Sequence, residues 1–272
     1  LSQSSSIPAL HFLLGELPVE GLIHINTLSL FHNIWSNPDL TVNSMVAYIL
    51  KMCKGNSTTW SNHVQLICQK YGIPSPLALL SSGPACSKSS WNTLVKTRVT
   101  VWHEEDLRRK AASNSKMQYL NVELCGLSGW PHPALQNIYT TQEAKKLRLH
   151  LKFLTGDFLT NERLSLDNPS ISPACTLCQA PTDCTEHVLV VCRATSEVRD
   201  RLLPELLNTV ASVQPMNQLL MNNHSASILT QFVLDCTSIN LPETIRVPAH
   251  NPGASDIFRV FRAWCFYTAR SA

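Results

Sequence analysis

Apolar residues recur along this 272-residue chain at helical spacing, and this periodicity restricts the fold more than any other feature of the sequence. Two stripes with the spacing i, i+3, i+4, i+7 lie between residues 42 and 71, and each can cover one face of a helix. A short turn, Gly55-Asn56-Ser57, separates them and predicts an antiparallel helical hairpin. The stripes consist of Val42, Met45, Val46, Ile49, Leu50 and Cys53, and of Trp60, His63, Val64, Ile67, Cys68 and Tyr71.

Most of the remaining chain shows the same period, and no apolar/polar alternation is long enough to build a sheet. A mainly α fold is therefore predicted. Thr140 to Glu143 fits a capping box, in which the threonine hydroxyl and the glutamate carboxylate satisfy free N–H groups at a helix start. The predicted helices cover 22–35, 91 through 102, 141–155, about 186–203, 228–234 and 257–268, and packing in the core is the predicted role of Trp35, Trp60, Trp91, Trp102 and Trp264.

The formal net charge of +3 conceals a basic middle third. Residues 88–152 carry eleven basic and five acidic side chains, whereas residues 1–87 are neutral and residues 153–272 sum to −3. A basic face of this kind can meet a polyanion, although a solvated lysine-rich helix face is the alternative. The basic side chains are Arg108, Arg109 and Lys110, and then Lys145, Lys146, Arg148 and Lys152 around an apolar side of Ala144, Leu147, Leu151 and Leu154.

The strongest chemical signal is the spacing C-x2-C-x8-H-x4-C, formed by Cys175, Cys178, His187 and Cys192. A C-x2-C turn lets two thiolates grip one ion, and a histidine and a cysteine five residues apart can supply the other two corners of a tetrahedron. This set suits structural Zn²⁺ and leaves no open position for a catalytic water. Cys184 is an alternative fourth ligand in place of His187, and buried thiols beside a surface histidine are the alternative without a metal.

The other six cysteines are isolated, as expected for small core residues, and no basic leader precedes them. We therefore expect a reducing, intracellular compartment, nucleus or cytoplasm. The two N-glycosylation sequons, at Asn56 and Asn223, are then chance matches. No stretch approaches the roughly 20 apolar residues that span a bilayer, so no membrane partner is expected.

Catalytic signatures are missing from the sequence. His103-Glu104-Glu105-Asp106 begins like a zincin motif, but leucine at position 107 replaces the second histidine. No phosphate-binding glycine loop and no nucleophile elbow occur. We therefore expect that the chain is not an enzyme.

Several segments, taken in order, resemble the region that follows the polymerase core in non-LTR (LINE-type) retrotransposon reverse transcriptases. The resemblance covers most of the chain, and the C-C-H-C knuckle is its most specific motif. No Asp-Asp pair occurs, although a reverse transcriptase needs paired palm aspartates for two metal ions. Other matching segments include Leu17-Pro18-Val19-Glu20, Leu28-Ser29-Leu30-Phe31, Trp35-Ser36-Asn37-Pro38-Asp39, Pro131-His132-Pro133-Ala134-Leu135, Leu154-Thr155-Gly156-Asp157-Phe158-Leu159-Thr160 and Arg262-Ala263-Trp264-Cys265.

The resemblance implies a thumb-to-carboxyl-terminal region without catalysis, which would position template RNA or target DNA for the remainder of the polyprotein. The basic side chains named above would contact phosphates. The alternative is a zinc-stabilised helical protein-interaction module without a nucleic-acid role. Linkers at 81–90 and 167–173 predict four segments: a helical thumb-like segment 1–80, a basic helical connector 90–166, a CCHC zinc knuckle 172–195 and a C-terminal helical segment 196–272.

Overall fold

A computed structural model of the chain describes residues 6–267, except for 38, 53–58, 83–84, 124, 128, 137, 212–225 and 236–258. Helices are the regular structure of this part of the chain, and no strand occurs among the described residues. The prediction of a mainly α fold is therefore confirmed. The chain divides into two compact units, which we call the insert unit (Leu17–Arg109) and the main unit (Leu1–Glu16 with Lys110–Ala272).

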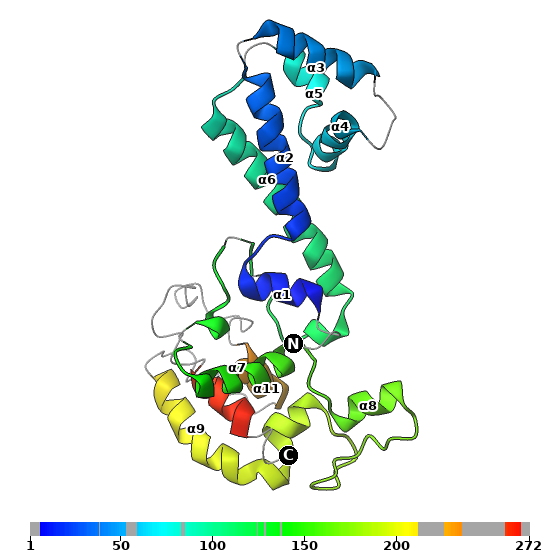
Figure 1. Cartoon of the computed structure of the whole chain (residues 1–272). Coiled ribbons are helices and arrows are strands. Elements are labelled where there is room, and N and C mark those ends of the chain that lie inside the picture. Colours follow the sequence, from blue (N-terminus) through cyan, green and yellow to red (C-terminus); the bar gives the residue numbers. More distant parts are fainter. Residues whose placement is uncertain are drawn as a thin grey trace. The chain divides into compact units, whose positions relative to one another are not determined.

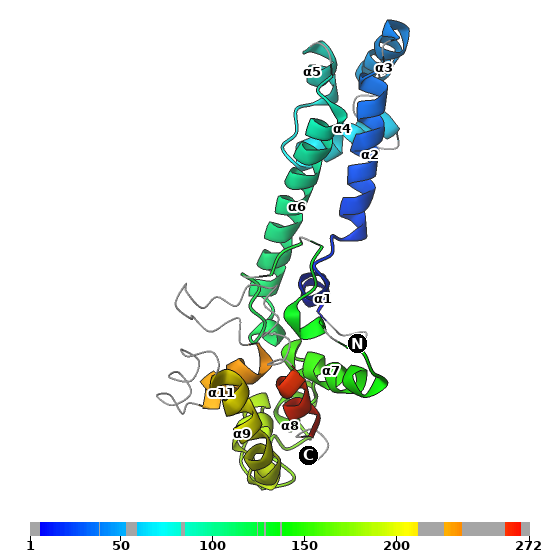
Figure 2. The same ribbon diagram turned by 90° about the vertical axis from the view of Figure 1, so that its left-hand side faces the viewer.

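In the described part of the insert unit, five helices (Figures 1 and 2) surround an aromatic core. Trp91 lies at its centre, where its indole N–H donates to the carbonyl of Leu28 at 3.0 Å and its ring packs edge-on against Trp35. A buried Trp needs such an acceptor for its N–H. The helices are α2 (Val19–Trp35), α3 (Leu40–Met52), α4 (Trp60–Lys70), α5 (Pro76–Ser81) and α6 (Lys88–Ala112), the last of which continues into the main unit.

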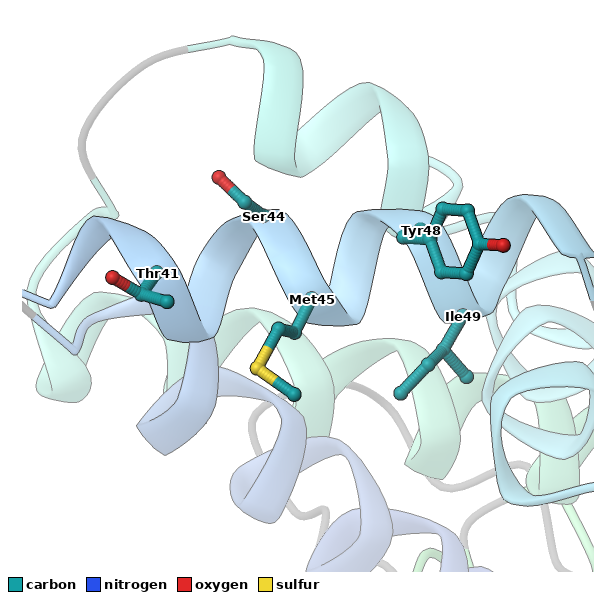
Figure 3. Close-up of a pocket in the computed structure, with 5 residues that line it drawn as sticks. All are labelled: Thr41, Ser44, Met45, Tyr48 and Ile49. Atoms are coloured by element: carbon teal, nitrogen blue, oxygen red, sulfur yellow. The ribbon is translucent and has the colours of Figure 1, made fainter.

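Helices α3 and α4 occur where the two stripes predict them, whereas the predicted turn Gly55-Asn56-Ser57 lies outside the described residues, so their antiparallel pairing stays a prediction. Val64, Ile67 and Cys68 are buried on α4, and the hydroxyl of Thr59 caps its first turn by accepting from Asn62 N–H. On α3, Leu50 packs inward, whereas Met45 and Ile49 of the predicted stripe lie on an exposed face, and Cys53 lies outside the described residues. Figure 3 shows this exposed face, which is lined by Thr41, Ser44, Met45, Tyr48 and Ile49.

A hydrogen-bonded trio of rings joins α2, α4 and α6 inside the insert unit. The Tyr71 hydroxyl lies 2.6 Å from Nδ1 of His24 and 3.0 Å from Nε2 of His103. Gly21 allows this approach, because a Cβ there would lie 3.0 Å from the His103 ring. Around the trio, the Glu20 carboxylate accepts from Lys70, whose ammonium lies over the Trp102 ring. Trp60 is 38% exposed, so the prediction that it packs in the core is wrong.

The main unit contains the remaining helices, which Figures 1 and 2 label where space allows. Its core joins the end of α7 to α11 and to the final helix at 259–267, through Phe153, Phe232 and Phe261. Residues 257, 258 and 268 of the predicted last helix lie outside the described residues. The elements are α1 (Ile7–Leu14), η1 (Ser115–Met117), η2 (Pro133–Leu135), α7 (Thr141–Leu154), α8 (Asn161–Asp167), η3 (His187–Val191), η4 (Arg193–Thr195), α9 (Ser196–Ala211) and α11 (Ala226–Leu234).

Buried charged groups link these elements within the main unit. Arg262, only 1% exposed, donates to the carbonyl of Ala134 at 3.2 Å and to the Glu143 carboxylate at 3.4 Å. Directly after α11, the fully buried Asp235 carboxylate accepts the backbone N–H of Asn121 at 2.9 Å. Buried charges of this kind are costly unless they are paired, so these contacts specify how the helices of the unit pack.

The predicted linkers coincide with gaps between helices, since α5 ends at Ser81 and α6 begins at Lys88, while α8 ends at Asp167. The compact units follow a different division, with boundaries at 16/17 and 109/110. Whether the four segments 1–80, 90–166, 172–195 and 196–272 act as domains stays a prediction.

Acidification is expected to destabilise the insert unit through His103. Burial, with a smaller contribution from the Lys70 charge, lowers the pKa of His103 from 6.5 to about 4. Between these pH values the unfolded chain binds more protons than the folded chain, so the free energy of unfolding falls as the pH falls from 6.5 toward 4. Urea unfolding at about pH 7.5 and about pH 5, followed by tryptophan fluorescence, measures the loss.

The variant H103Q should lose part of this pH dependence, whereas H63Q, which replaces an exposed histidine on α4, should keep it. The same pH dependence in H103Q as in the natural chain would contradict the assignment to His103.

Candidate metal centre

The first half of the metal-binding motif is a tight turn that presents two cysteines from one loop. Two backbone hydrogen bonds close the turn: Gln179 N–H donates to the Cys175 carbonyl at 3.0 Å, and Cys175 N–H donates to the Ala180 carbonyl at 2.9 Å. Gln179 has φ of 61°, and among the described residues it is the only non-glycine residue with a positive φ. Since non-glycine residues rarely adopt a positive φ, the turn depends on stabilising contacts from its surroundings.

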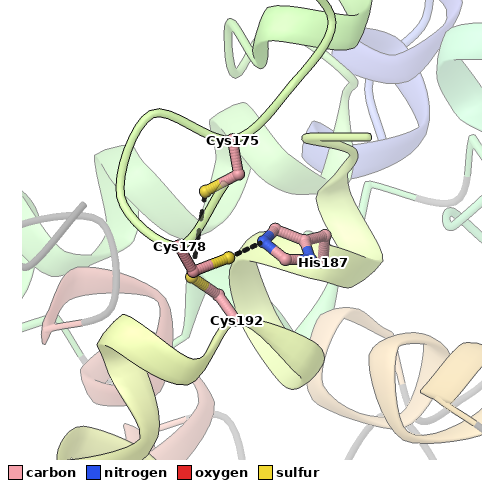
Figure 4. Close-up of side chains that lie close together, drawn as sticks. All are labelled: Cys175, Cys178, His187 and Cys192. Atoms are coloured by element: carbon pink, nitrogen blue, oxygen red, sulfur yellow. Dashed lines mark hydrogen bonds between the residues drawn. The ribbon is translucent and has the colours of Figure 1, made fainter. Parts of the chain in front are cut away.

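The second half is a single π-helical turn, η3. Cys192 N–H donates to the His187 carbonyl at 2.7 Å, five residues back, and Cys192 then leaves the helix with an extended backbone. The predicted continuous helix over 186–203 is therefore wrong, because the chain breaks at Cys192 before η4 and α9 begin. The break turns the side chains of both His187 and Cys192 toward the cysteine loop (Figure 4).

Three sulfur atoms and one ring nitrogen converge between these halves, all within 4.8 Å of one another. The Sγ atoms of Cys175 and Cys192 are 3.9 Å apart, and Sγ of Cys178 lies 3.2 Å from Nε2 of His187. Cys175, Cys192 and His187 are buried, whereas Cys178 is half-buried. These four predicted ligands form a group that can hold a metal ion.

Cys184, the alternative fourth ligand, does not belong to this group. Its Sγ accepts the backbone N–H of His187 at 3.4 Å and so caps the turn that carries the histidine. Burial raises the pKa of the Cys184 thiol, whereas the backbone N–H of Ala180 lowers the pKa of the Cys178 thiol. The geometry therefore favours His187 over Cys184.

Contacts that the sequence did not reveal hold the cluster within the main unit. The Asp183 carboxylate accepts Asn161 N–H at 3.0 Å, and the Asn161 side chain donates to the carbonyl of Ala174 at 2.9 Å. Trp264, on the last helix, donates its indole N–H to the Leu189 carbonyl of η3 at 3.0 Å. Helix α8 was not predicted from the sequence, although Thr160 at its N-cap is a residue type that typically begins a helix.

Helix α7 presents its predicted basic residues on two different faces. Lys145 and Arg148 are exposed and Lys152 is half-buried, and their spacing places them on one face, here called the basic stripe. Lys146 instead lies on the packed face, with its ammonium 3.0 Å from the Glu143 carboxylate. No ion pair engages the three side chains of the basic stripe within the described part of the chain.

The predicted apolar side of α7 is buried only in part. Leu154 is fully buried, Leu147 and Leu151 are half-buried and Ala144 is exposed, whereas His150 and Phe153, outside the predicted side, are fully buried. His150 donates from Nε2 to the Leu234 carbonyl at 2.8 Å, and burial lowers its pKa to about 4, so the ring is neutral at neutral pH. The Thr140 cap is present at 3.1 Å, but the Glu143 carboxylate faces Lys146 and Arg262 rather than completing a capping box.

The second predicted basic group, on α6, is paired with acids of the same helix. Arg108 lies 3.6 Å from Glu104, and Arg109 lies 3.6 Å from Asp106. Lys110 is exposed at the point where the helix enters the main unit. Such pairs at i, i+3 and i, i+4 reduce the charge that these arginines offer to a polyanion.

No protein-family model matches the chain, and neither does any curated protein or solved structure. Within the described residues, no helix is both long and apolar enough to cross a membrane. The geometry of the cysteine–histidine cluster and of the basic stripe is therefore the basis for a functional proposal.

Replacing Cys178 by serine should abolish metal binding, whereas replacing Cys184 by serine should preserve it. A serine at 178 removes one of the four converging ligand atoms, while a serine at 184 can still accept the His187 N–H bond. Elemental mass spectrometry on protein purified under reducing conditions without chelator should find roughly one ion per chain for the natural chain and for C184S. Equal metal loss in both variants would contradict the assigned ligand set.

Proposed function

We propose that the cluster holds a structural Zn²⁺ ion. Three thiolates and one imidazole are a common set for tetrahedral zinc, and Zn–S and Zn–N bonds of about 2.3 and about 2.0 Å place the ligand atoms roughly 3.5–3.8 Å apart. The separations of 3.9 and 3.2 Å between ligand atoms support this assignment. Since four protein ligands complete a tetrahedron, the ion would stabilise the loop and would not activate water.

We further propose that the chain is a non-catalytic nucleic-acid-binding region that positions template RNA or target DNA. In this proposal its partner is the remainder of a LINE-type reverse transcriptase polyprotein, which its motifs resemble, and it acts inside the cell, in the nucleus or cytoplasm. The observation that carries the proposal is the basic stripe of Lys145, Arg148 and Lys152, three cations on one face of α7 without acidic partners in the described residues.

The dimensions of the stripe suit a phosphate backbone. Seven residues of helix separate Lys145 from Lys152, which is about 10 Å at about 1.5 Å per residue. Phosphates of one strand follow each other about every 3.4 Å along a duplex axis, so three cations on this length can each meet a phosphate. Contacts of this kind position a strand without reading its sequence.

Reversing Lys145 and Arg148 to glutamate should weaken binding to all nucleic-acid sequences alike. Each lost phosphate contact should flatten the log–log salt dependence by about 0.7 to 0.9, so K145E/R148E should lower the slope by roughly 1.4 to 1.8. Fluorescence anisotropy with a labelled primer–template, between about 50 and about 200 mM salt, measures this.

K96E/R98E is the matched control, because it makes the same charge change on exposed positions of α6. Lys146 and Arg262 are unsuitable for reversal, since each pairs with Glu143 inside the main unit. Equal, salt-insensitive binding by the natural chain and both variants would rule out the basic stripe as a phosphate contact.

The second candidate function is a protein-interaction module, which the exposed stripe of α3 favours. Met45, Tyr48 and Met52 are each more than 60% exposed, and this face of α3 carries no charge between residues 41 and 49. Exposed apolar surface of this kind often marks a contact with another protein. Nucleic-acid binding that does not change with salt concentration in the anisotropy experiment would favour this candidate.

The isolated chain should neither extend a primer nor cleave DNA in the presence of Mg²⁺. Its sequence contains no Asp-Asp pair to hold two catalytic metal ions, and the proposed zinc site is closed. Primer extension by the homogeneous chain would show that an active site exists elsewhere in it.

A further inference from the structure

A cleft of about 130 Å³ lies in the main unit, beside the cysteine–histidine cluster. Residues from η1, from the turn after α7, from α8 and from the start of the η3 turn line it. Its two cations are Lys116 and Arg163, and the exposed Glu162 adds the one carboxylate of the lining. The hydroxyl groups that line the cleft belong to Ser115, Tyr119, Thr160 and Thr185.

Arg163 differs from the other arginines of the main unit that are not exposed. The residue is half-buried, and no ion pair or hydrogen bond engages its guanidinium within the described residues. By contrast, Arg199 donates to the Thr195 hydroxyl and Arg262 donates to Glu143. An arginine held in a concave site with its planar donors unused is suited to bind an anion with two or more oxygens.

The wall that carries Lys116 is held in place by close backbone contact. Gly156, with φ of 66°, lies so close that a Cβ would stand 2.6 Å from the Lys116 carbonyl oxygen. The next turn is anchored by Phe158, whose ring stacks on Phe153 at 3.9 Å between centroids. The cleft is therefore a built feature of the packing, with Lys116 and Arg163 on its lining.

The size and donors of the cleft define its ligand. Its volume is that of about four water molecules and is below the roughly 300 Å³ of pockets for drug-sized ligands, so it has room for one phosphate group. Burial raises the pKa of Tyr119 to about 12, which keeps its phenol protonated and able to donate. We propose that this cleft binds a phosphate group through Arg163 and Lys116, independently of the basic stripe on α7.

The test is titration of the full chain with inorganic phosphate, followed by ³¹P NMR. We expect saturable binding that R163Q weakens about tenfold, because a charge-assisted guanidinium contact is lost. R193Q, which removes the same charge from an exposed position next to the cysteine–histidine cluster, should change the affinity less than about twofold. K116Q, the second cleft variant, should also weaken phosphate binding, and it serves as the test if R163Q alters the fold.

No saturable binding by the natural chain, or equal losses in R163Q and R193Q, would overturn the proposal. Anisotropy with a single-stranded RNA then separates two sources of phosphate. If R163Q also weakens RNA binding, the bound phosphate belongs to a nucleic-acid strand; if only inorganic phosphate binding falls, the ligand is a free phosphate or monoester. Phosphate binding that persists in K145E/R148E would support the cleft even where the basic stripe fails.

Discussion

The convergence of three sulfurs and one imidazole controls the path of the chain through the carboxyl-terminal half of the main unit. The cysteine loop depends on a left-handed Gln179, and the η3 turn is a single π-helical turn, so neither half is a stable element alone. Other elements nevertheless end on them, since Asn161 of α8 bonds to Asp183 and Trp264 bonds to Leu189. A bound metal would therefore stabilise α8 and the last helix as well as its own loop.

Buried charge is the second constraint on the main unit. Arg262 and Glu143 meet where η2, α7 and the last helix pack, and this pairing removes Glu143 from its expected capping role and holds Lys146 on the packed face. The basic residues of α7 therefore have two different roles. Lys146 belongs to the packing, while Lys145, Arg148 and Lys152 remain available to a polyanion. Together with the phosphate cleft around Arg163, this gives the unit two separate anion-binding candidates.

The helical period was enough to place most helices, and the C-x2-C-x8-H-x4-C spacing was enough to predict which four side chains converge, although Cys184 was excluded from the group only by the structure. The errors arose where packing overrides local pattern. Met45 and Ile49 fit an apolar stripe but face solvent, and His150 interrupts an apolar stripe but is fully buried with its Nε2 on the Leu234 carbonyl. A neutral histidine can be buried in a core when it is hydrogen-bonded, but a pattern of apolar residues does not assign histidine to the buried face.

The sequence by itself determined the helical class, the approximate positions of most helices and the candidate set of metal-ligating residues. Those properties depend on residues within about one to five helical turns of one another. Only the tertiary structure decided the break at Cys192, the roles of Lys146 and Arg262, and the cleft that joins Lys116 to Arg163. The role of Arg262 and the cleft depend on partners far away in the chain, and the free energy of burying a charge is set by the partner that it meets.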